Sequence, residues 1–121
     1  MKVSIVIRNW NYGAFLTDAV DSALAQTYVL TEVIVVDDGS TDDSRAVLAL
    51  YGSRIQVILK ENGGEGSAVN AGFAAAPADI ILFLDSNDVL APQTVACIVA
   101  LWSRRVTRVH FPLHAMGADG T

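Results

Sequence analysis

Five apolar, β-branched runs, separated by segments of a different periodicity, constrain the fold more than any other feature of this sequence. They occupy residues 3–7, 32–36, 55–59, 79–84 and 105–111. The first, second and fourth are almost continuously apolar, which is typical of strands in a parallel sheet covered on both faces. The fifth alternates polar and apolar residues and is followed by Pro112, so we expect an edge strand there.

The segments between these runs have helical spacing. Residues 13–26 carry apolar side chains at positions i, i+3 and i+4, which predicts a helix with one apolar face. The other predicted helices are a short one ending near Leu50, a small-residue helix at 66–75, and a last one with Pro92 in its first turn. Alternating strands and helices predict an α/β fold, a Rossmann-like, mostly parallel sheet with helices on both faces, in a single domain over residues 1–121.

The start of the short second helix has its own signal. The stretch "GSTDDS" offers Ser40 or Thr41 as the N-cap, and it places Asp42 and Asp43 at the positive end of the helix dipole. We therefore expect a side-chain cap at this end of the helix.

Composition excludes several classes of partner. The net charge is −5, and no basic cluster is longer than the pair Arg104 and Arg105, so a nucleic-acid-binding surface is not expected. The longest apolar helix, at 94–102, is about half of the ~20 residues that span a bilayer, and no signal peptide is recognisable. Cys97 is the single cysteine and is expected to pack in the core. These features predict a cytoplasmic location, with peripheral membrane attachment of a longer protein left open.

Polar residues follow the predicted strands. They are "RNWN" at 8–11, "DDGS" at 37–40, "ENGG" at 61–64 and "DSND" at 85–88. Ligands of open α/β sheets bind outside the carboxyl ends of the strands, where these four loops would converge. Each loop alone is also typical of an ordinary turn or helix cap. Four on one edge favour a shared ligand site.

The residue types at these loops indicate a nucleotide diphosphate. The oxygens of Asp85 and Asn87 could hold Mg²⁺ or Mn²⁺, which would bridge to a diphosphate. Asp37 could accept hydrogen bonds from a base N–H or a sugar hydroxyl, and Trp10 offers a ring for stacking. The sequence therefore predicts a nucleotide that carries a further group on its diphosphate.

Four motifs resemble those of family 2 glycosyltransferases, which have the GT-A fold. They are "VSIVIRNWN", "VIVVDDGSTDDS", "ENGGEGSAVNAGF" and "IILFLDSNDVLAP", in the family's order and spacing over residues 3–92. The resemblance implies a nucleotide-sugar donor, most often linked to UDP, and inverting transfer to an acceptor hydroxyl. It leaves the acceptor, a saccharide or a lipid-linked molecule, unknown.

The resemblance also implies roles for individual residues. Asp37 corresponds to the aspartate that binds the base, the segment from Asn62 to Asn70 flanks base and ribose, and Asp85 to Asn87 is similar to the family's DxD motif. The implied donor-binding residues are Ile7, Arg8, Asn9, Asn11, Asp37, Asn62, Gly64, Ala68, Asp85 and Ser86. The implied ligands of a divalent cation, Mg²⁺ or Mn²⁺, are Asp85 and Asn87.

The chain departs from the family pattern at four positions. Arg8 stands where many members have Pro, Trp10 where many have Tyr, and Val69 where an Arg is frequent. Asn87 replaces the second acid of the DxD motif, which removes a full negative charge. We therefore expect a weakened metal site unless Asp88 takes over.

The general base of inverting transfer lies, in this family, in an acceptor-binding half that follows the segment resembling residues 105–113. We therefore expect this chain to be the donor-binding half of a truncated GT-A unit, able to bind nucleotide and inactive in transfer by itself. The alternative is a non-catalytic nucleotide-sugar-binding module or an inactive relative. A dinucleotide-binding dehydrogenase is disfavoured, because "RNWNYG" replaces G-x-G-x-x-G. His110 and His114 are interpreted as structural, since Pro112 between them prevents a helical metal pair.

Overall fold

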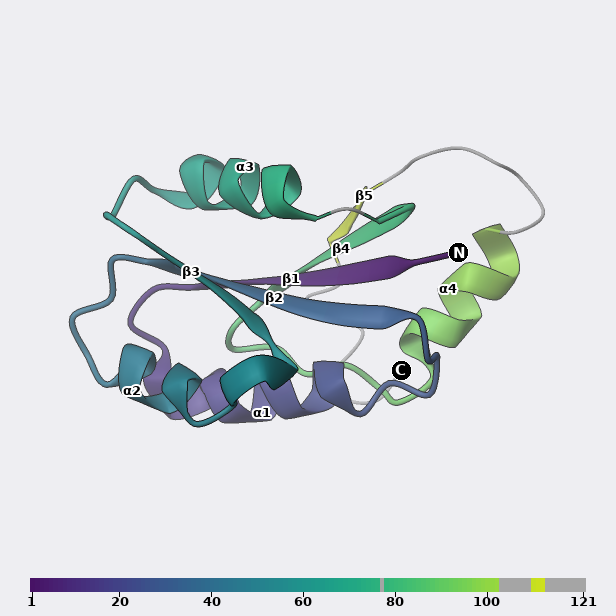
Figure 1. The fold of residues 1–121 in the computed structure, drawn as a ribbon, viewed down its shortest axis with the longest axis horizontal. Coiled ribbons are helices and arrows are strands. Elements are labelled where there is room, and N and C mark those ends of the chain that lie inside the picture. The colour runs from purple at the N-terminus through teal and green to yellow at the C-terminus, as the bar shows by residue number, and fades with distance from the viewer. Residues whose placement is uncertain (77, 103–109, 113–121) are drawn as a thin grey trace.

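The described residues form a five-stranded parallel sheet (Figure 1). A computed structural model describes residues 1–76, 78–102 and 110–112. The strand order is β3-β2-β1-β4-β5. The strands are β1 (Val3–Asn9), β2 (Thr31–Asp38), β3 (Gln56–Lys60), β4 (Ile80–Asp85) and β5 (His110–Pro112). This confirms the predicted α/β architecture with a parallel sheet.

Helices cover both faces of the sheet, as predicted. They are α1 (Gly13–Leu24), α2 (Ser44–Ala49), α3 (Glu65–Ala75) and α4 (Thr94–Trp102), with a 3-10 turn at Gly52–Arg54. Figure 1 shows α3 on one side of the sheet, with α1 and α2 on the other. Helix α4 packs on the α1 side, because Val95 and Ile98 share a hydrophobic cluster with Leu16.

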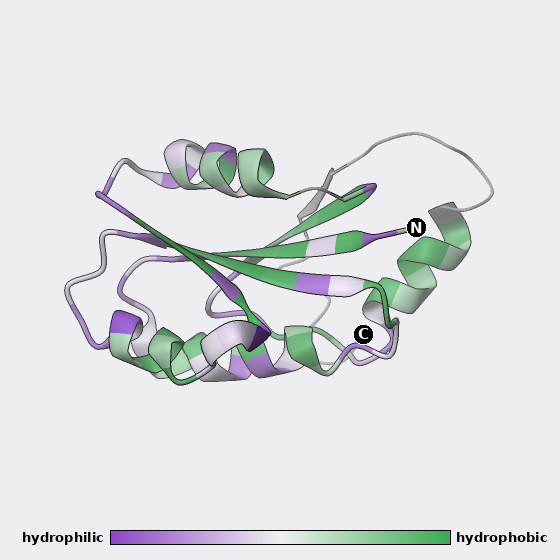
Figure 2. Ribbon diagram, in the orientation of Figure 1, coloured by the Kyte–Doolittle hydropathy of each residue, from purple (hydrophilic) through white to green (hydrophobic). Residues whose placement is uncertain are grey.

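The alternation of side chains along each strand divides the core in two. Ile5 and Ile7 point to the α1 side, while Val6 points to the α3 side. Figure 2 shows the middle of the sheet as hydrophobic, with hydrophilic residues toward the strand ends. The α3 side is thin because α3 approaches closely: a Cβ added at Gly72 would overlap the side chain of Val6. The small residues of this helix therefore allow it to pack closely on the sheet.

Two predicted helix boundaries are wrong by a few residues. Helix α1 ends at Leu24 instead of continuing to residue 26, and α4 begins at Thr94, so Pro92 lies before the helix. The expectation that Cys97 packs in the core is also wrong, because its side chain is exposed. The periodicity of a short apolar helix does not reveal which face is turned to solvent.

The predicted cap of α2 is wrong for a physical reason. Asp43 occupies the N-cap position without a side-chain hydrogen bond to the helix. The Ser40 hydroxyl instead donates to the buried Asp37 carboxylate at 2.6 Å. Because α2 begins only at Ser44, Ser40 and Thr41 lie before its N-cap, and the Ser40 oxygen accepts from the backbone N–H of Asn11 instead.

The predicted edge strand is confirmed in position. Among the strands of the described residues, β5 pairs with β4 alone and forms one border of the sheet. Residues 105–109 of the predicted run lie outside the described residues. None of the described helices is long and apolar enough to cross a membrane.

Candidate functional site

The register of the sheet brings the carboxyl ends of its central strands together. Asn9 pairs with Asp37 across β1 and β2, and Arg8 pairs with Asp85 across β1 and β4. Asp37 and Asp85 therefore flank β1 at the same edge of the sheet. The predicted convergence of strand ends is confirmed for these strands.

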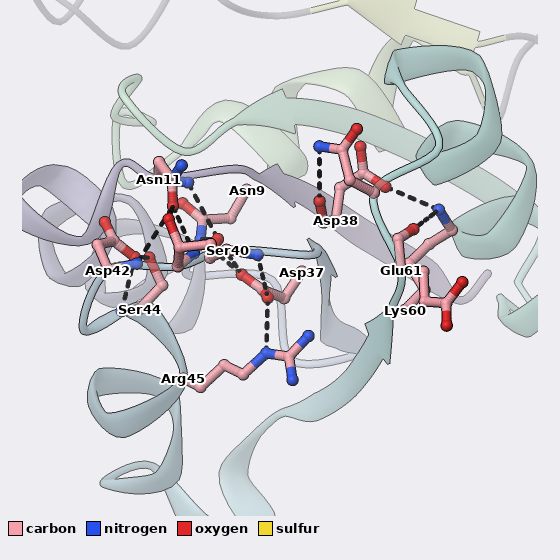
Figure 3. A network of polar contacts seen from close by, with 12 residues as sticks. Asn9, Asn11, Asp37, Asp38, Ser40, Asp42, Ser44, Arg45, Lys60 and Glu61 are labelled. Carbon is pink, nitrogen blue, oxygen red and sulfur yellow. Dashed lines mark hydrogen bonds and ion pairs between the residues drawn. The ribbon is translucent and has the colours of Figure 1, made fainter.

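Asp37 is at the centre of a first polar network on the α1 side (Figure 3). Its side chain is fully buried. Oδ1 accepts hydrogen bonds from Asn9 Nδ2 at 2.9 Å and from the Ser40 hydroxyl. Oδ2 accepts from the backbone N–H of Ser40 and from Arg45 Nε, each at 3.1 Å. Protein donors thus satisfy both oxygens, so a base could bond to Asp37 only by replacing one of them.

Asn11 extends this network by joining the loops after β1 and β2. Its Oδ1 accepts from the backbone N–H of Thr41 at 2.7 Å and of Asp42 at 3.3 Å. Its backbone has a φ of 57°, a left-handed conformation that asparagine tolerates better than most residues. Asn11 thus fixes the loop positions, and its predicted contact with a donor stays a prediction.

Asp42 ties the starts of α1 and α2 together. Its carboxylate accepts from the backbone N–H groups of Gly13 and Ser44, each at 2.9 Å. Burial opposes ionisation, but these bonds and the one from the Ser44 hydroxyl outweigh it and hold the pKa of Asp42 below its ordinary value. A charged Asp42 therefore helps to fix this side of the edge.

Asp38 organises a second network, on the α3 side of the sheet (Figure 3). Lys60 Nζ lies 2.7 Å from Oδ1, which also accepts from the backbone N–H of Gly63, and Oδ2 accepts from that of Gly64. Asn62 Nδ2 donates to the Asp38 carbonyl at 3.0 Å. Burial would raise the pKa of Asp38, but Lys60 and the glycine amides outweigh it and lower that pKa.

Sequence reasoning placed Asp38 at this edge without giving it a role, and it missed Lys60. The alternation of side chains along β2 contained a signal for Asp38. Asp38 follows Ile34 and Val36 on the α3 side of the sheet, whereas Asp37 lies on the opposite side. Lys60 ends an apolar run in register with Asp38. The loop of Asn62 and Gly64, predicted to flank a ligand, is held in place by this pair.

The end of β4 is more open. Arg8 NH2 lies 3.1 Å from Asp85 Oδ1, and the two side chains are 27% and 41% exposed. The backbone N–H of Ser86 donates to the Arg8 carbonyl, and Asn87 is exposed in the turn that follows. Within the described part of the chain, Ser86 Oγ and Asn9 Oδ1 are buried without a hydrogen-bond partner. Such atoms are where a water or a ligand is expected to bind.

The donor set at β4 fits a divalent cation poorly. Among the described residues, no three His, Cys, Asp or Glu side chains are grouped as metal ligands. Asp85 already faces the guanidinium of Arg8, and Asn87 contributes no charge. Mg²⁺ and Mn²⁺ prefer several oxygen ligands with negative charge among them. Asp85 and Asn87, the predicted metal ligands, therefore do not form a metal site by themselves.

Two predicted site residues contribute no side chain to the edge. Ile7 and Ala68 are fully buried, on the α1 and α3 sides of the sheet. Only their backbone atoms could face a ligand, so a donor contact of either residue stays a prediction. Trp10 is 47% exposed after β1, and a stacking role for it stays a prediction.

Comparison with known proteins gives consistent matches. A family model described as "Glycosyl transferase family 2" matches residues 4–112. An uncharacterized glycosyltransferase from Nostoc sp. (strain PCC 7120) is 43% identical over 106 residues, which cover 84% of this chain and 33% of that protein. The chain thus spans about a third of the length of this curated relative.

Solved structures agree with this match. The S. aureus TarS 1-349 complex with UDP superposes with a TM-score of 0.79 at 27% identity, over 86% of this chain and 32% of that chain. Glucosyl-3-phosphoglycerate synthase from Mycobacterium tuberculosis, solved with Mn²⁺ and uridine-diphosphate-glucose, gives a TM-score of 0.67 at 29% identity. That superposition covers 82% of this chain and 38% of the synthase. The fold is that of GT-A glycosyltransferases.

Proposed function

Because the chain belongs to glycosyl transferase family 2, we propose that it binds the donor of an inverting glycosyltransferase, a UDP-linked sugar, for transfer to an acceptor hydroxyl. One observation carries the proposal. The carboxyl ends of β1, β2 and β4 present Asn9, Arg8, Asp37 and Asp85 at one edge. Ligands of open α/β sheets bind at such an edge.

The similar structures support a nucleotide diphosphate as the ligand. TarS was solved with UDP, and the synthase from Mycobacterium tuberculosis with uridine-diphosphate-glucose. In our proposal the base lies near Asp37 and Asn11, and the diphosphate lies near Arg8 and Asp85. The buried Asn9 Oδ1 and Ser86 Oγ, which have no partner among the described residues, would gain one from the ligand or from water.

The rigid part of this edge would act by positioning. Asp37 and Asp38 fix the loops after β1, β2 and β3 through hydrogen bonds within the chain itself. A preformed site avoids the entropic penalty of ordering these loops when the donor binds. Holding the donor still is also what an attack by an acceptor hydroxyl requires.

We propose that the chain alone binds the donor without completing transfer. Inverting transfer needs a general base for the acceptor hydroxyl. The described acids of the β2 end, Asp37 and Asp38, are held by protein donors, so we assign neither this role. The curated relative from Nostoc sp. is about three times as long as the matched segment, which leaves room for an acceptor-binding part. A cytoplasmic location stays a prediction of the sequence.

Calorimetric titration with UDP, GDP and dTDP tests the proposed function. We expect UDP to bind most tightly, and Asn9→Ala to weaken its binding. Val29→Ala is a suitable control, since Val29 is 90% exposed and precedes β2, at the amino ends of the strands. If none of the three nucleotides binds, with or without Mn²⁺, the chain is not a donor-binding unit.

A non-catalytic binding module is the second candidate, and Asn87 favours it because the amide withholds the charge of the second DxD acid. The two candidates differ in the protein that contains this chain together with an acceptor-binding part. A transferase would consume a UDP-sugar and release UDP, whereas a binding module would bind the UDP-sugar and leave it intact.

A further inference from the structure

We propose that Arg8 acts as a built-in cation for the donor diphosphate and takes the place of a divalent metal ion at the end of β4. The proposal rests on the proposed function and names a binding residue within that site. It starts from the disagreement between the predicted metal ligands, Asp85 and Asn87, and the structure, in which a guanidinium already faces Asp85.

The position of Arg8 is fixed by the sheet. Arg8 pairs in register with Asp85 across the parallel strands β1 and β4, and the backbone N–H of Ser86 donates to the Arg8 carbonyl at 3.1 Å. The backbone therefore holds the guanidinium beside the loop that resembles the DxD motif. Of its N–H donors, NH2 bonds to Asp85, and the guanidinium meets no further acceptor among the described residues. A guanidinium has five such donors in a planar fork, which matches the oxygens of a phosphate.

Arg8 is also the basic residue of this edge that can leave its carboxylate partner with the smallest loss of free energy. Arg45 and Lys60 pair with Asp37 and Asp38, whose side chains are 0% and 3% exposed. Moving the Arg45 or Lys60 side chain away would leave a buried carboxylate without its counter-ion, which is strongly unfavourable. Asp85 is 41% exposed, so water can solvate it when the Arg8 guanidinium turns to a phosphate.

A metal ion and Arg8 would compete for the same carboxylate. A divalent ion on Asp85 would lie a few ångströms from the guanidinium, where like charges repel. Asn87 cannot compensate, because its amide is neutral. The charge that a diphosphate needs is therefore supplied at this position by the chain itself, and metal binding requires that Arg8 be displaced.

Calorimetric titration with UDP, in buffer with Mn²⁺ and in buffer with EDTA, tests the inference. The wild-type chain should bind UDP with affinities that agree within about threefold in the two buffers, since charge is already present. Arg8→Ala should lose about tenfold or more in EDTA, the size expected for a charge-assisted phosphate contact. Mn²⁺ should restore part of this loss, because Asp85 is then free. Arg8→Lys should keep more of the binding than Arg8→Ala, since the charge remains.

A second readout does not involve nucleotide. Titration with Mn²⁺ alone should show no uptake by the wild-type chain and measurable uptake by the double variant Arg8→Ala, Asn87→Asp, which frees one carboxylate and adds another. Arg54→Ala is the matched control for loss of an arginine: Arg54 packs on the Tyr51 ring before β3, at the amino end of the strands. Thermal unfolding of each variant confirms that the chain is folded.

The inference is overturned if wild-type binding of UDP requires Mn²⁺, or if Arg8→Ala binds UDP in EDTA as tightly as the wild type does. Uptake of Mn²⁺ by the wild-type chain without nucleotide would also overturn it. A different result marks failure of the proposed function: no tested nucleotide binds the wild-type chain in either buffer, and this inference then falls with it.

Discussion

The ends of β2 and β4 look alike in sequence and differ in the structure. Asp37 and Asp38, which end β2, are buried, and both oxygens of each carboxylate accept hydrogen bonds from protein donors. Asp85, which ends β4, is half exposed, its one ion pair within the described ranges is that with Arg8, and Asn87 is exposed beside it. Acidic residues at strand ends can therefore either hold the loops in place or stay available to a ligand. Burial of the carboxylate distinguishes the first role from the second.

The physical reason is the requirement for partners. A buried carboxylate without hydrogen bonds or a counter-ion would be strongly destabilising, so Asp37 and Asp38 recruit Arg45, Lys60 and loop amides. Water can solvate Asp85, which leaves its neighbours available for a ligand. The β2 end therefore holds the loops, and the β4 end remains adjustable.

The largest effect on stability should come from removing the Asp37 carboxylate, which holds the loops at the end of β2. Asp37→Ala removes the acceptor of Asn9, Ser40 and Arg45, and we expect a loss of about 3 kcal/mol in the free energy of unfolding. Urea denaturation measures this loss. Asp85→Ala is the matched variant at β4. Equal losses of stability in the two variants would contradict the difference that we infer between the ends of β2 and β4.

A backbone change at the same end should have the next largest effect. Gly39 has a φ of +78°, and an added Cβ would lie 2.5 Å from the backbone nitrogen of Asn62. We expect Gly39→Ala to destabilise the chain by about 1–3 kcal/mol, through strain and overpacking. Gly66→Ala, with open space around its Cβ, controls for loss of a glycine. Equal stability of the two variants would show that the β2 end is not tightly packed.

Acid should weaken the β2 end in a predictable direction. Because the pKa of Asp38 is lower in the folded chain than its ordinary value, ionised Asp38 contributes stability above the unfolded pKa of about 3.9. That contribution is lost as the pH falls through the lower, folded value. Unfolding measured from neutral to acidic pH should show a shallower decline in Asp38→Asn than in the wild type. Parallel curves would mean that Asp38 does not contribute to the acid sensitivity.

The smallest effect on stability should come from the β4 end. Asp85→Ala removes a partly exposed ion pair, and we expect a change below about 1 kcal/mol in the free energy of unfolding. The same variant should bind UDP in EDTA at least as well as the wild type, because Arg8 is released from its partner. Calorimetry measures the second quantity, and a large loss of binding would mean that Asp85 itself contacts the donor.

Strand periodicity was sufficient to predict the sheet, and the polar strand ends predicted which edge to inspect. The apolar runs ending at Arg8, Asp37 and Asp85 are explicit in the sequence, and parallel pairing then aligns them. The partners of the acids were not predictable in this way. Arg45 and Lys60 reach Asp37 and Asp38 from other elements with long side chains, and only three-dimensional placement decides such pairs.

The exposure and hydrogen-bond partners of individual side chains could not be predicted from the sequence either. Cys97 resembles a core residue in a helix of high apolar content, yet the helix turns it to solvent. Ser40 resembles a helix cap, yet the helix begins only at Ser44, and the Ser40 hydroxyl donates to the buried carboxylate of Asp37. In both cases several local solutions are compatible with the pattern, and packing of distant segments selects one.

The most direct test of the central claim is an NMR titration of the ¹⁵N-labelled chain with UDP. If a nucleotide diphosphate binds at the carboxyl ends of the strands, the backbone amide signals of Asn9, Asn11 and Ser86 should shift, while those near Leu30 and Asp79, at the amino ends of β2 and β4, should stay in place. Shifts confined to the amino ends would contradict the account, as would a spectrum that saturating UDP leaves unchanged.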